Sequence, residues 1–211
     1  MDDEPPRLML FTPPIGDVAA FASRLSACVL SGEVAAVALA FADADERWLT
    51  NAVKGLAPLV QAKGAAALVV DRPRIVARGG ADGVHLTSAH DLAETLEARK
   101  SQDLIVGVAG LRLRDDAMAA AEKGADYLLF GEPRADGTLP PLAAVIDRVR
   151  WWAEIFETPC VALAPSLDAV PDLVATGAEF IGLRECVWTH ADGPAAAIAL
   201  ARRLMTRGLL V

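Results

Sequence analysis

The sequence predicts an α/β protein folded as a single (β/α)8 TIM barrel domain that occupies residues 1–211. A unit of glycine, alanine and an acidic residue, followed by an apolar run, occurs at residues 80–86, 124–130 and 177–183. The glycine suits the left-handed end of a helix, and the apolar run suits a buried strand. Apolar runs and helix-like segments alternate along the chain. No G-x-G-x-x-G follows the first run, which disfavours the alternative of an open, doubly wound sheet.

The predicted strands are short apolar runs, as expected of parallel strands buried on both faces. They are residues 8–11, 34–40, 66–70, 83–86, 104–108, 127–130, 160–163 and 180–183. Helices are predicted at residues 18–31, 46–63, 90–100, 114–123, 142–156, 167–176 and 194–205, and Pro73 suits a further helix start. Asp17 is suited to cap the first helix and Gly32 to end it. Gly55 and Pro58 are expected to break or kink the second helix.

Composition excludes several classes of protein. The chain is 54% hydrophobic and 23% charged, which is typical of a globular protein with a sizeable core. Its net charge of −8 argues against binding to nucleic acid or to an anionic membrane. Residues 1–6 are acidic, unlike a secretory signal, and no apolar stretch reaches the ~18 residues of a membrane span. The cysteines are scattered, and we expect reduced thiols in a cytoplasmic protein: Cys28, Cys160 and Cys186.

Two stretches resemble the thiamine phosphate synthase family, which includes a sister branch of thiazole tautomerases. Residues 69–72 (Val-Val-Asp-Arg) and 80–86 (Gly-Ala-Asp-Gly-Val-His-Leu) are similar to the family's Ile-Asn-Asp-Arg and Gly-Ala-Asp-Gly-Val-His-Leu. Residues 105–108 (Ile-Val-Gly-Val) and 122–131 (Glu-Lys-Gly-Ala-Asp-Tyr-Leu-Leu-Phe-Gly) are similar to Ile-Ile-Gly-Val and Lys-Ala-Gly-Ala-Asp-Tyr-Ile-Gly-Phe-Gly. The resemblance implies a barrel that joins hydroxymethylpyrimidine diphosphate to thiazole phosphate, with Mg²⁺ helping pyrophosphate to leave.

The chain departs from the family at the positions that carry this chemistry. The family's Gln-Leu-Arg-x-Lys motif aligns with residues 38–42, where Ala38, Ala40 and Ala42 replace the three polar side chains. Such groups neutralise the charge of departing pyrophosphate. The other replaced positions are Val70 for the pyrimidine-binding Asn, His90 for a metal-binding Asp, Ala109 for a Ser, Leu111 for the tautomerase His, Ala164-Pro165 for Gly-Gly, and Glu185 for the phosphate-cradling Ser.

The remaining polar residues give candidates for a ligand site at the carboxyl ends of the strands. We expect ligand contacts from Asp71 and Arg72 after the third strand, from His85, and from Gly131 and Glu132 after the sixth. The resemblance implies Mg²⁺ at Asp71, and the displaced Asp91 is the candidate for its second carboxylate.

Each candidate also has a structural interpretation. Asp71 could cap a helix before Arg-Pro, a lone His85 is more often a hydrogen-bonded core residue, and Asp91 suits the first turn of a helix. Arg184 and Glu185 are expected to form an ion pair at the barrel mouth. Asp82, Asp126 and Glu179 lie at the amino ends of strands, and tryptophans 48, 151 and 152 lie on helices, so both sets are expected to be structural.

No residue is assigned a catalytic role. The favoured hypothesis is a thiamine-phosphate-synthase-like barrel of the cytoplasm whose ancestral activity is lost or strongly reduced. One alternative is an enzyme with a changed small-molecule substrate, using Asp71, His85, His90 and the loop at residues 132–136. Another is a non-catalytic barrel that binds a small ligand or a partner, including a second copy of itself. In no case do we expect nucleic acid or a membrane as the partner.

Overall fold

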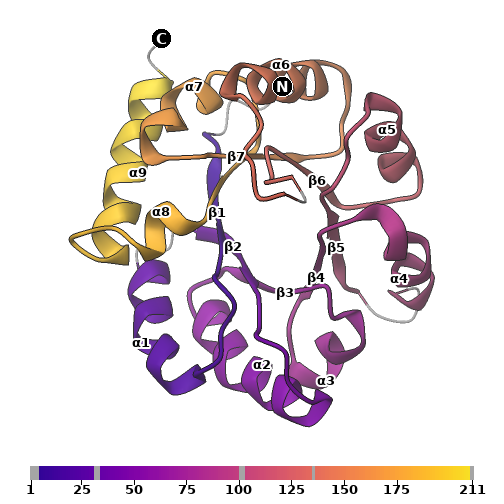
Figure 1. Cartoon of the computed structure of the whole chain (residues 1–211), viewed down its shortest axis with the longest axis vertical. Helices are drawn as coiled ribbons and strands as arrows, with labels where there is room; N and C mark the ends of the chain where they lie inside the picture. Colours follow the sequence, from indigo (N-terminus) through magenta and orange to yellow (C-terminus); the bar gives the residue numbers. More distant parts are fainter. Residues whose placement is uncertain (1–4, 31–33, 100–102, 135, 210–211) are drawn as a thin grey trace.

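The computed structural model describes residues 5–30, 34–99, 103–134 and 136–209. Parallel strands close into a barrel in chain order, with β8 pairing back to β1 (Figure 1). The strands are β1 (Arg7–Phe11), β2 (Val34–Leu39), β3 (Ala66–Val70), β4 (Gly83–Leu86), β5 (Ile105–Val108), β6 (Tyr127–Phe130), β7 (Cys160–Leu163) and β8 (Phe180–Leu183). The prediction of a closed (β/α)8 barrel is therefore confirmed.

Helices surround the barrel and connect its strands (Figure 1). They are α1 (Val18–Val29), α2 (Glu46–Gln61), α3 (Val76–Gly79), α4 (Leu92–Arg99), α5 (Arg114–Glu122), α6 (Leu142–Ile155), α7 (Val170–Val174), α8 (Glu185–Trp188) and α9 (Pro194–Gly208). Short 3-10 turns, η1 (Pro73–Ile75), η2 (Ala89–Asp91) and η3 (Leu167–Ala169), precede α3, α4 and α7. None of the described helices is both long and apolar enough to cross a membrane.

The structure corrects one helix expectation, the break at Gly55 and Pro58, and adds one helix that the sequence did not predict. The second predicted helix is one continuous element, α2, although Pro58 lies inside it. Leu56, Ala57 and Val60 around the proline are fully buried, and this packing holds the helix together despite the missing N–H. The short helix α8 was not expected, because its four residues carry no periodic pattern. The expected stop of the first helix at Gly32 lies outside the described residues.

The three acidic residues of the repeated unit have one structural role. Asp82 Oδ2 accepts the N–H of Ala67 on β3 (2.7 Å), and Asp126 Oδ2 accepts that of Val106 on β5 (2.6 Å). Glu179 Oε2 accepts the N–H of Cys160 on β7 (2.8 Å) in the same way. Each carboxylate, which lies just before its own strand, therefore accepts a hydrogen bond from the start of the preceding strand. The structural role predicted for these acidic residues is confirmed.

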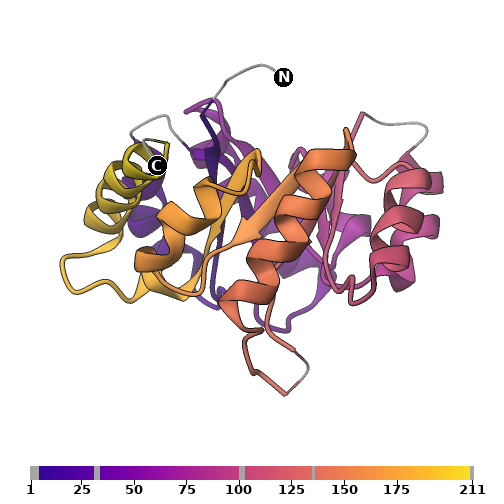
Figure 2. The same ribbon diagram turned by 90° about the horizontal axis from the view of Figure 1, so that it is seen from above.

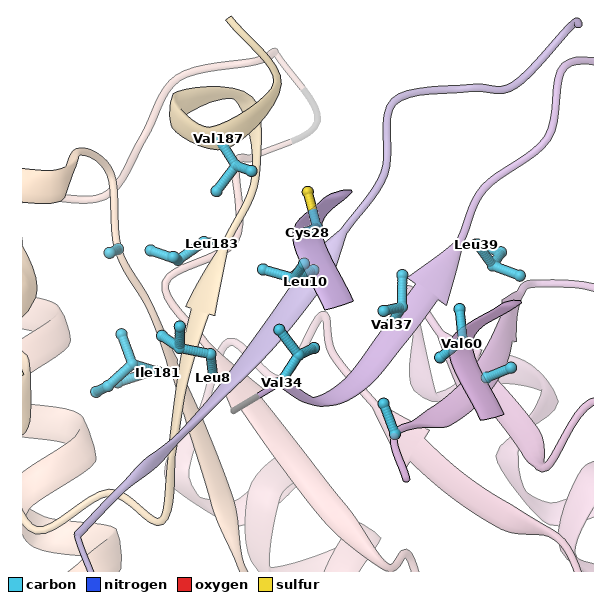
Figure 3. Packing of buried hydrophobic residues seen from close by; sticks show 14 of the residues in the cluster. Leu8, Leu10, Cys28, Val34, Val37, Leu39, Val60, Ile181, Leu183 and Val187 are labelled. Atoms are coloured by element: carbon cyan, nitrogen blue, oxygen red, sulfur yellow. The ribbon is translucent and has the colours of Figure 1, made fainter. Parts of the chain in front are cut away.

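The core has two layers, as expected of a barrel. The outer layer lies between strands and helices. Figure 3 shows part of it, where Leu10 of β1 and Val37 of β2 lie among side chains of α1, α2 and α8. The inner layer fills the barrel with mostly apolar side chains: Met9, Phe11, Ala38, Leu68, Ala109, Tyr127, Leu129, Val161 and Leu163. Ala38 and Ala109 are 0% and 2% exposed, so two positions where the family is implied to carry polar groups are here part of an apolar interior.

Candidate functional site

A cavity of about 580 Å³ lies on the carboxyl-terminal side of the barrel, between the loops after β4, β5 and β6 and helix α6. Active sites of this fold are built from those loops. The loop from β6 to α6 extends beyond the barrel at the end opposite the amino terminus (Figure 2). The residues that line the cavity are Thr87, Ser88, Gly110, Leu111, Arg112, Phe130, Gly131, Glu132, Pro133, Arg134, Pro140, Pro141, Ala144, Val145 and Arg148.

The loop after β5 is fixed from two sides. The Gly110 N–H donates to Glu132 Oε1 at 2.9 Å. On α6, Arg148 Nη1 donates to the Leu111 carbonyl at 2.7 Å and Nη2 donates to the Arg112 carbonyl at 2.6 Å. Gly110 has a φ of 76°, and a Cβ there would lie 2.7 Å from the Thr87 carbonyl oxygen, so the close approach of the two loops requires glycine. The wall of the cavity is thus held by a carboxylate and a guanidinium.

Glu132 is the half-buried carboxyl group of this cavity. Burial raises the pKa of the Glu132 carboxyl, while its backbone hydrogen bonds, the Gly110 N–H among them, and the charges of Arg148 and Arg112 act in the opposite direction. Gly131 precedes it with a φ of 103°. The structure therefore brings Gly131 and Glu132, both predicted from the sequence, into one cavity. The neighbouring residue 135 lies outside the described residues.

Asp71 lies at the edge of this region and contacts Thr87, which lines the cavity. Asp71 Oδ1 accepts the Thr87 N–H at 2.8 Å, and Oδ2 accepts the Thr87 hydroxyl at 2.6 Å. The capping interpretation is wrong, because η1 has no side-chain cap. Asp71 has a φ of 51°, a conformation that aspartate tolerates and that recurs at functional sites. Its carboxylate links the loops after β3 and β4.

Arg72 does not join the cavity lining. Its Nη2 lies 3.0 Å from Asp43 Oδ1, and the two side chains are 41% and 100% exposed. Exposed pairs of this kind contribute little to stability. A ligand role for Arg72 stays a prediction, since its guanidinium is directed to the loop after β2 in this structure.

His85 lies inside the barrel, not at its mouth. It is 3% exposed, its Nδ1 is 2.8 Å from the Tyr127 hydroxyl, and its ring makes an edge contact with Phe11. Burial lowers the pKa of His85 to about 4, partly opposed by the Asp71 carboxylate and supported by Arg184. The surroundings are those of a hydrogen-bonded core residue, which was the structural interpretation of this histidine.

The described residues do not present a ready-made magnesium site. Both oxygens of Asp71 accept hydrogen bonds from Thr87, and the Asp91 side chain is 63% exposed, with Oδ1 3.7 Å from His90 Nε2. No group of three or more His, Cys, Asp or Glu side chains suited to a metal occurs among the residues that the structure describes. Mg²⁺ usually binds to only one or two carboxylates and completes its octahedral shell with water and substrate phosphates, so a cluster of three protein ligands is not required. Mg²⁺ at Asp71 and Asp91 stays a prediction of the resemblance, and no step below depends on it.

The mouth beyond β7 and β8 contains only a small cavity. Its cavity has about 40 Å³ and is lined by Leu163, Ala164, Pro165 and Cys186, among other residues. Arg184 Nη2 pairs with Glu185 Oε1 at 3.2 Å, which confirms the expected ion pair. Pro165 has no N–H to donate to an anion.

Sequence reasoning missed the cavity residues Arg112 and Arg148. Arg112 follows β5 in a stretch with alternating leucine and arginine, which gives no signal of a site. Arg148 lies on a helix far along the chain from the loop that it holds. Only the folded structure brings the two together.

The fold and the cavity together define a (β/α)8 barrel with a ligand-sized opening at the carboxyl ends of its strands. The chain belongs to the family described as thiamine monophosphate synthase, whose sequence model matches residues 8–187. This confirms the resemblance seen in the sequence.

Similar proteins agree over nearly the full length. A protein of Rhodospirillum centenum named thiamine-phosphate synthase is 42% identical over 203 residues, covering 94% of this chain and 97% of that protein. One of Hyphomonas neptunium with the same name is 34% identical over 202 residues, covering 91% and 90%. The solved thiamine phosphate pyrophosphorylase from Pyrococcus furiosus superposes with a TM-score of 0.78 at 24% identity, with 96% of each chain covered, which supports the fold.

Proposed function

We propose that this chain is a cytoplasmic member of the thiamine monophosphate synthase family in which the coupling of hydroxymethylpyrimidine diphosphate to thiazole phosphate is lost or strongly reduced. The observation that carries the proposal is the small cavity at the mouth beyond β7 and β8. Its volume of about 40 Å³ is far below the roughly 300 Å³ at which ligand pockets usually begin. A phosphate there would also meet the carboxylate of Glu185, which is implied to replace the family's serine.

The barrel interior supports the same proposal. Departing pyrophosphate needs cationic or hydrogen-bonding groups aimed at the developing charge. Ala38 and Ala109 offer methyl groups in a closed apolar layer, and Val70 packs against the same layer. Removal of a single oxyanion donor typically lowers turnover about 10²- to 10³-fold, so several losses together leave little of the rate.

The test is the coupling assay with both substrates and Mg²⁺. We expect thiamine phosphate to form at least ~10³-fold more slowly than with a family enzyme that retains the Gln-Leu-Arg-x-Lys motif, about 4 kcal/mol of lost transition-state stabilisation. A rate within tenfold of that enzyme, or growth of a synthase-deficient strain at ordinary expression, overturns the proposal.

A matched pair of variants locates the cause. Glu185→Ser removes the carboxylate at the β7–β8 mouth, and Glu154→Ser removes an exposed carboxylate on α6 outside both cavities. We expect only Glu185→Ser to tighten the binding of thiazole phosphate, because only Glu185 stands where its phosphate is implied to rest.

A second candidate function is the binding of a different small molecule, with or without turnover. The observation that favours it is the 580 Å³ cavity between the β4–β6 loops and α6, which lies within the usual range of about 300 to 1,000 Å³ for ligand pockets. It holds Gly131 and Glu132, and it adjoins the small cavity beyond β7 and β8, because Gly131 and Pro133 line both. This candidate stands whether or not the coupling reaction is slow.

A further inference from the structure

The cavity between the β4–β6 loops and α6 carries positive charge on an otherwise acidic molecule. Arg112, Arg134 and Arg148 line it together with Glu132 as its one carboxylate, whereas the whole chain has a net charge of −8. Clefts lined by one sign of charge concentrate ligands of the opposite sign. The cavity therefore favours an anion that the rest of the surface repels.

Two of these arginines are available to a ligand. Some arginines elsewhere in the described chain pair with carboxylates, as Arg72 does with Asp43, Arg78 with Glu46 and Arg99 with Asp126. The side chains of Arg112 and Arg134 make no hydrogen bond or ion pair with another described residue, while Glu132 is engaged by the Gly110 N–H. Guanidinium groups are suited to bind carboxylate and phosphate oxygens in pairs.

The backbone beneath Arg112 is fixed before any ligand arrives. The loop at residues 110–112 is held by the Gly110 bond to Glu132 and by the two bonds from Arg148 to the Leu111 and Arg112 carbonyls. Less ordering is then needed on binding, and preorganisation of this kind strengthens affinity.

Part of the cavity is apolar, beside the polar Thr87 and Ser88. Its lining includes the fully buried Leu111 and Phe130 and, on the outer side, three prolines and two residues of α6: Pro133, Pro140, Pro141, Ala144 and Val145. Rigid proline rings and a helix face make a surface on which a flat or branched apolar body can pack. An inorganic anion would leave this surface unused.

We propose that this cavity binds a small organic anion, a carboxylate or a phosphate ester, whose charged group pairs with Arg112 and Arg134 and whose apolar body packs on the prolines and Ala144. The proposal deepens the second candidate function and rests on it. It does not depend on the rate of the coupling reaction, which a separate assay measures with different substrates.

The test is calorimetric titration of the full chain with benzoate, phenyl phosphate, inorganic phosphate and chloride at equal ionic strength. We expect benzoate or phenyl phosphate to bind with a dissociation constant of about 1 mM or tighter. Benzoate alone identifies a carboxylate ligand, and phenyl phosphate alone identifies a phosphate ester. Chloride is expected not to bind.

Two matched pairs of variants separate the two parts of the cavity. Arg112→Gln is expected to weaken binding at least about tenfold, whereas Arg150→Gln, an exposed arginine of α6 outside the lining, leaves it unchanged. Ala144→Phe fills the apolar part and is expected to abolish binding, whereas Ala143→Phe, its exposed neighbour outside the lining, does not. Circular dichroism checks that each variant is folded.

Three outcomes overturn the proposal. The first is the absence of binding by both aromatic anions up to about 10 mM. The second is binding that Arg112→Gln leaves unchanged. The third is an affinity for inorganic phosphate that equals the affinity for phenyl phosphate and that Ala144→Phe does not change. The apolar body of the ligand would then contribute nothing to binding.

Discussion

His85 shows how one buried polar residue can make the stability of the barrel depend on pH. Its imidazole lies between Phe11 and Tyr127 and has a pKa of about 4, against an ordinary value near 6.5. Between about pH 4 and pH 6.5, His85 is protonated in the unfolded chain and neutral in the folded chain. The free energy of unfolding therefore falls as the pH is lowered from 6.5 towards 4, by up to about 3 kcal/mol from this group.

Urea unfolding at several pH values measures this fall. The carboxylates also titrate in the range, so the informative quantity is the difference between the native chain and His85→Gln, in which the buried proton site is gone. His90→Gln is the matched control, because the His90 side chain is 89% exposed. We expect a shallower pH dependence in His85→Gln and no change in His90→Gln. Equal slopes in all three proteins would contradict the assignment.

At the residue scale, the sequence predicts the site in part. Gly131 and Glu132 could be predicted because any residue after a barrel strand lies at the carboxyl-terminal face. The partners of these residues could not be predicted, since the hydrogen bond from the Gly110 N–H to the Glu132 carboxylate depends on how two loops pack. Arg72 illustrates the same limit: it follows β3 as predicted, yet its guanidinium pairs with Asp43 of another loop.

At the scale of elements, the repeated glycine, alanine and acid unit joins neighbouring strands as well as ending helices. The carboxylate of Asp82 accepts the Ala67 N–H and also two contacts of the Gln61 amide at 3.0 and 3.1 Å. Loss of the acceptor leaves a donor at the start of β3 without its partner. We expect Asp82→Ala to lower the free energy of unfolding by about 1 to 3 kcal/mol in urea titrations.

Asp82→Asn is the matched control, because its amide oxygen can still accept the Ala67 N–H. We expect it to lose less than half as much stability as Asp82→Ala. Equal losses in the two variants would show that the charge, rather than the hydrogen bond to β3, carries the effect.

Strands are the best-predicted elements of this chain. Their bounds match the sequence prediction to within one residue, because strands buried on both faces appear as uninterrupted apolar runs. Helices are less certain from sequence. Pro58 predicts a break in α2 that tertiary packing removes, and α8 is too short to show a period.

At the scale of the whole molecule, closure of the barrel joins the two ends of the chain. Residues 7–10 of β1 pair with residues 180–183 of β8, and Trp188 Nε1 donates to the Phe11 carbonyl at 2.7 Å. Helix α9 also packs against α1 and α7. The first strand therefore depends on the last for its hydrogen bonds, and we predict that the chain unfolds as one cooperative domain.

Tryptophan fluorescence tests this prediction, because only Trp48 lies in the first half of the chain and the other three follow residue 150. In a Trp48→Phe background, fluorescence reports the second half alone.

Leu56→Ala then opens a cavity beneath α2 in the first half, at a residue that is 0% exposed. Core truncations of this kind typically lower the free energy of unfolding by about 2 to 5 kcal/mol. If the chain is one domain, Leu56→Ala also lowers the urea concentration at which the fluorescence of the distant tryptophans reports half unfolding. Lys54→Ala, on the exposed face of α2, leaves that midpoint unchanged. If Leu56→Ala shifts the loss of helical circular dichroism without shifting the fluorescence, the two halves unfold separately, and closure by β1 and β8 does not couple them.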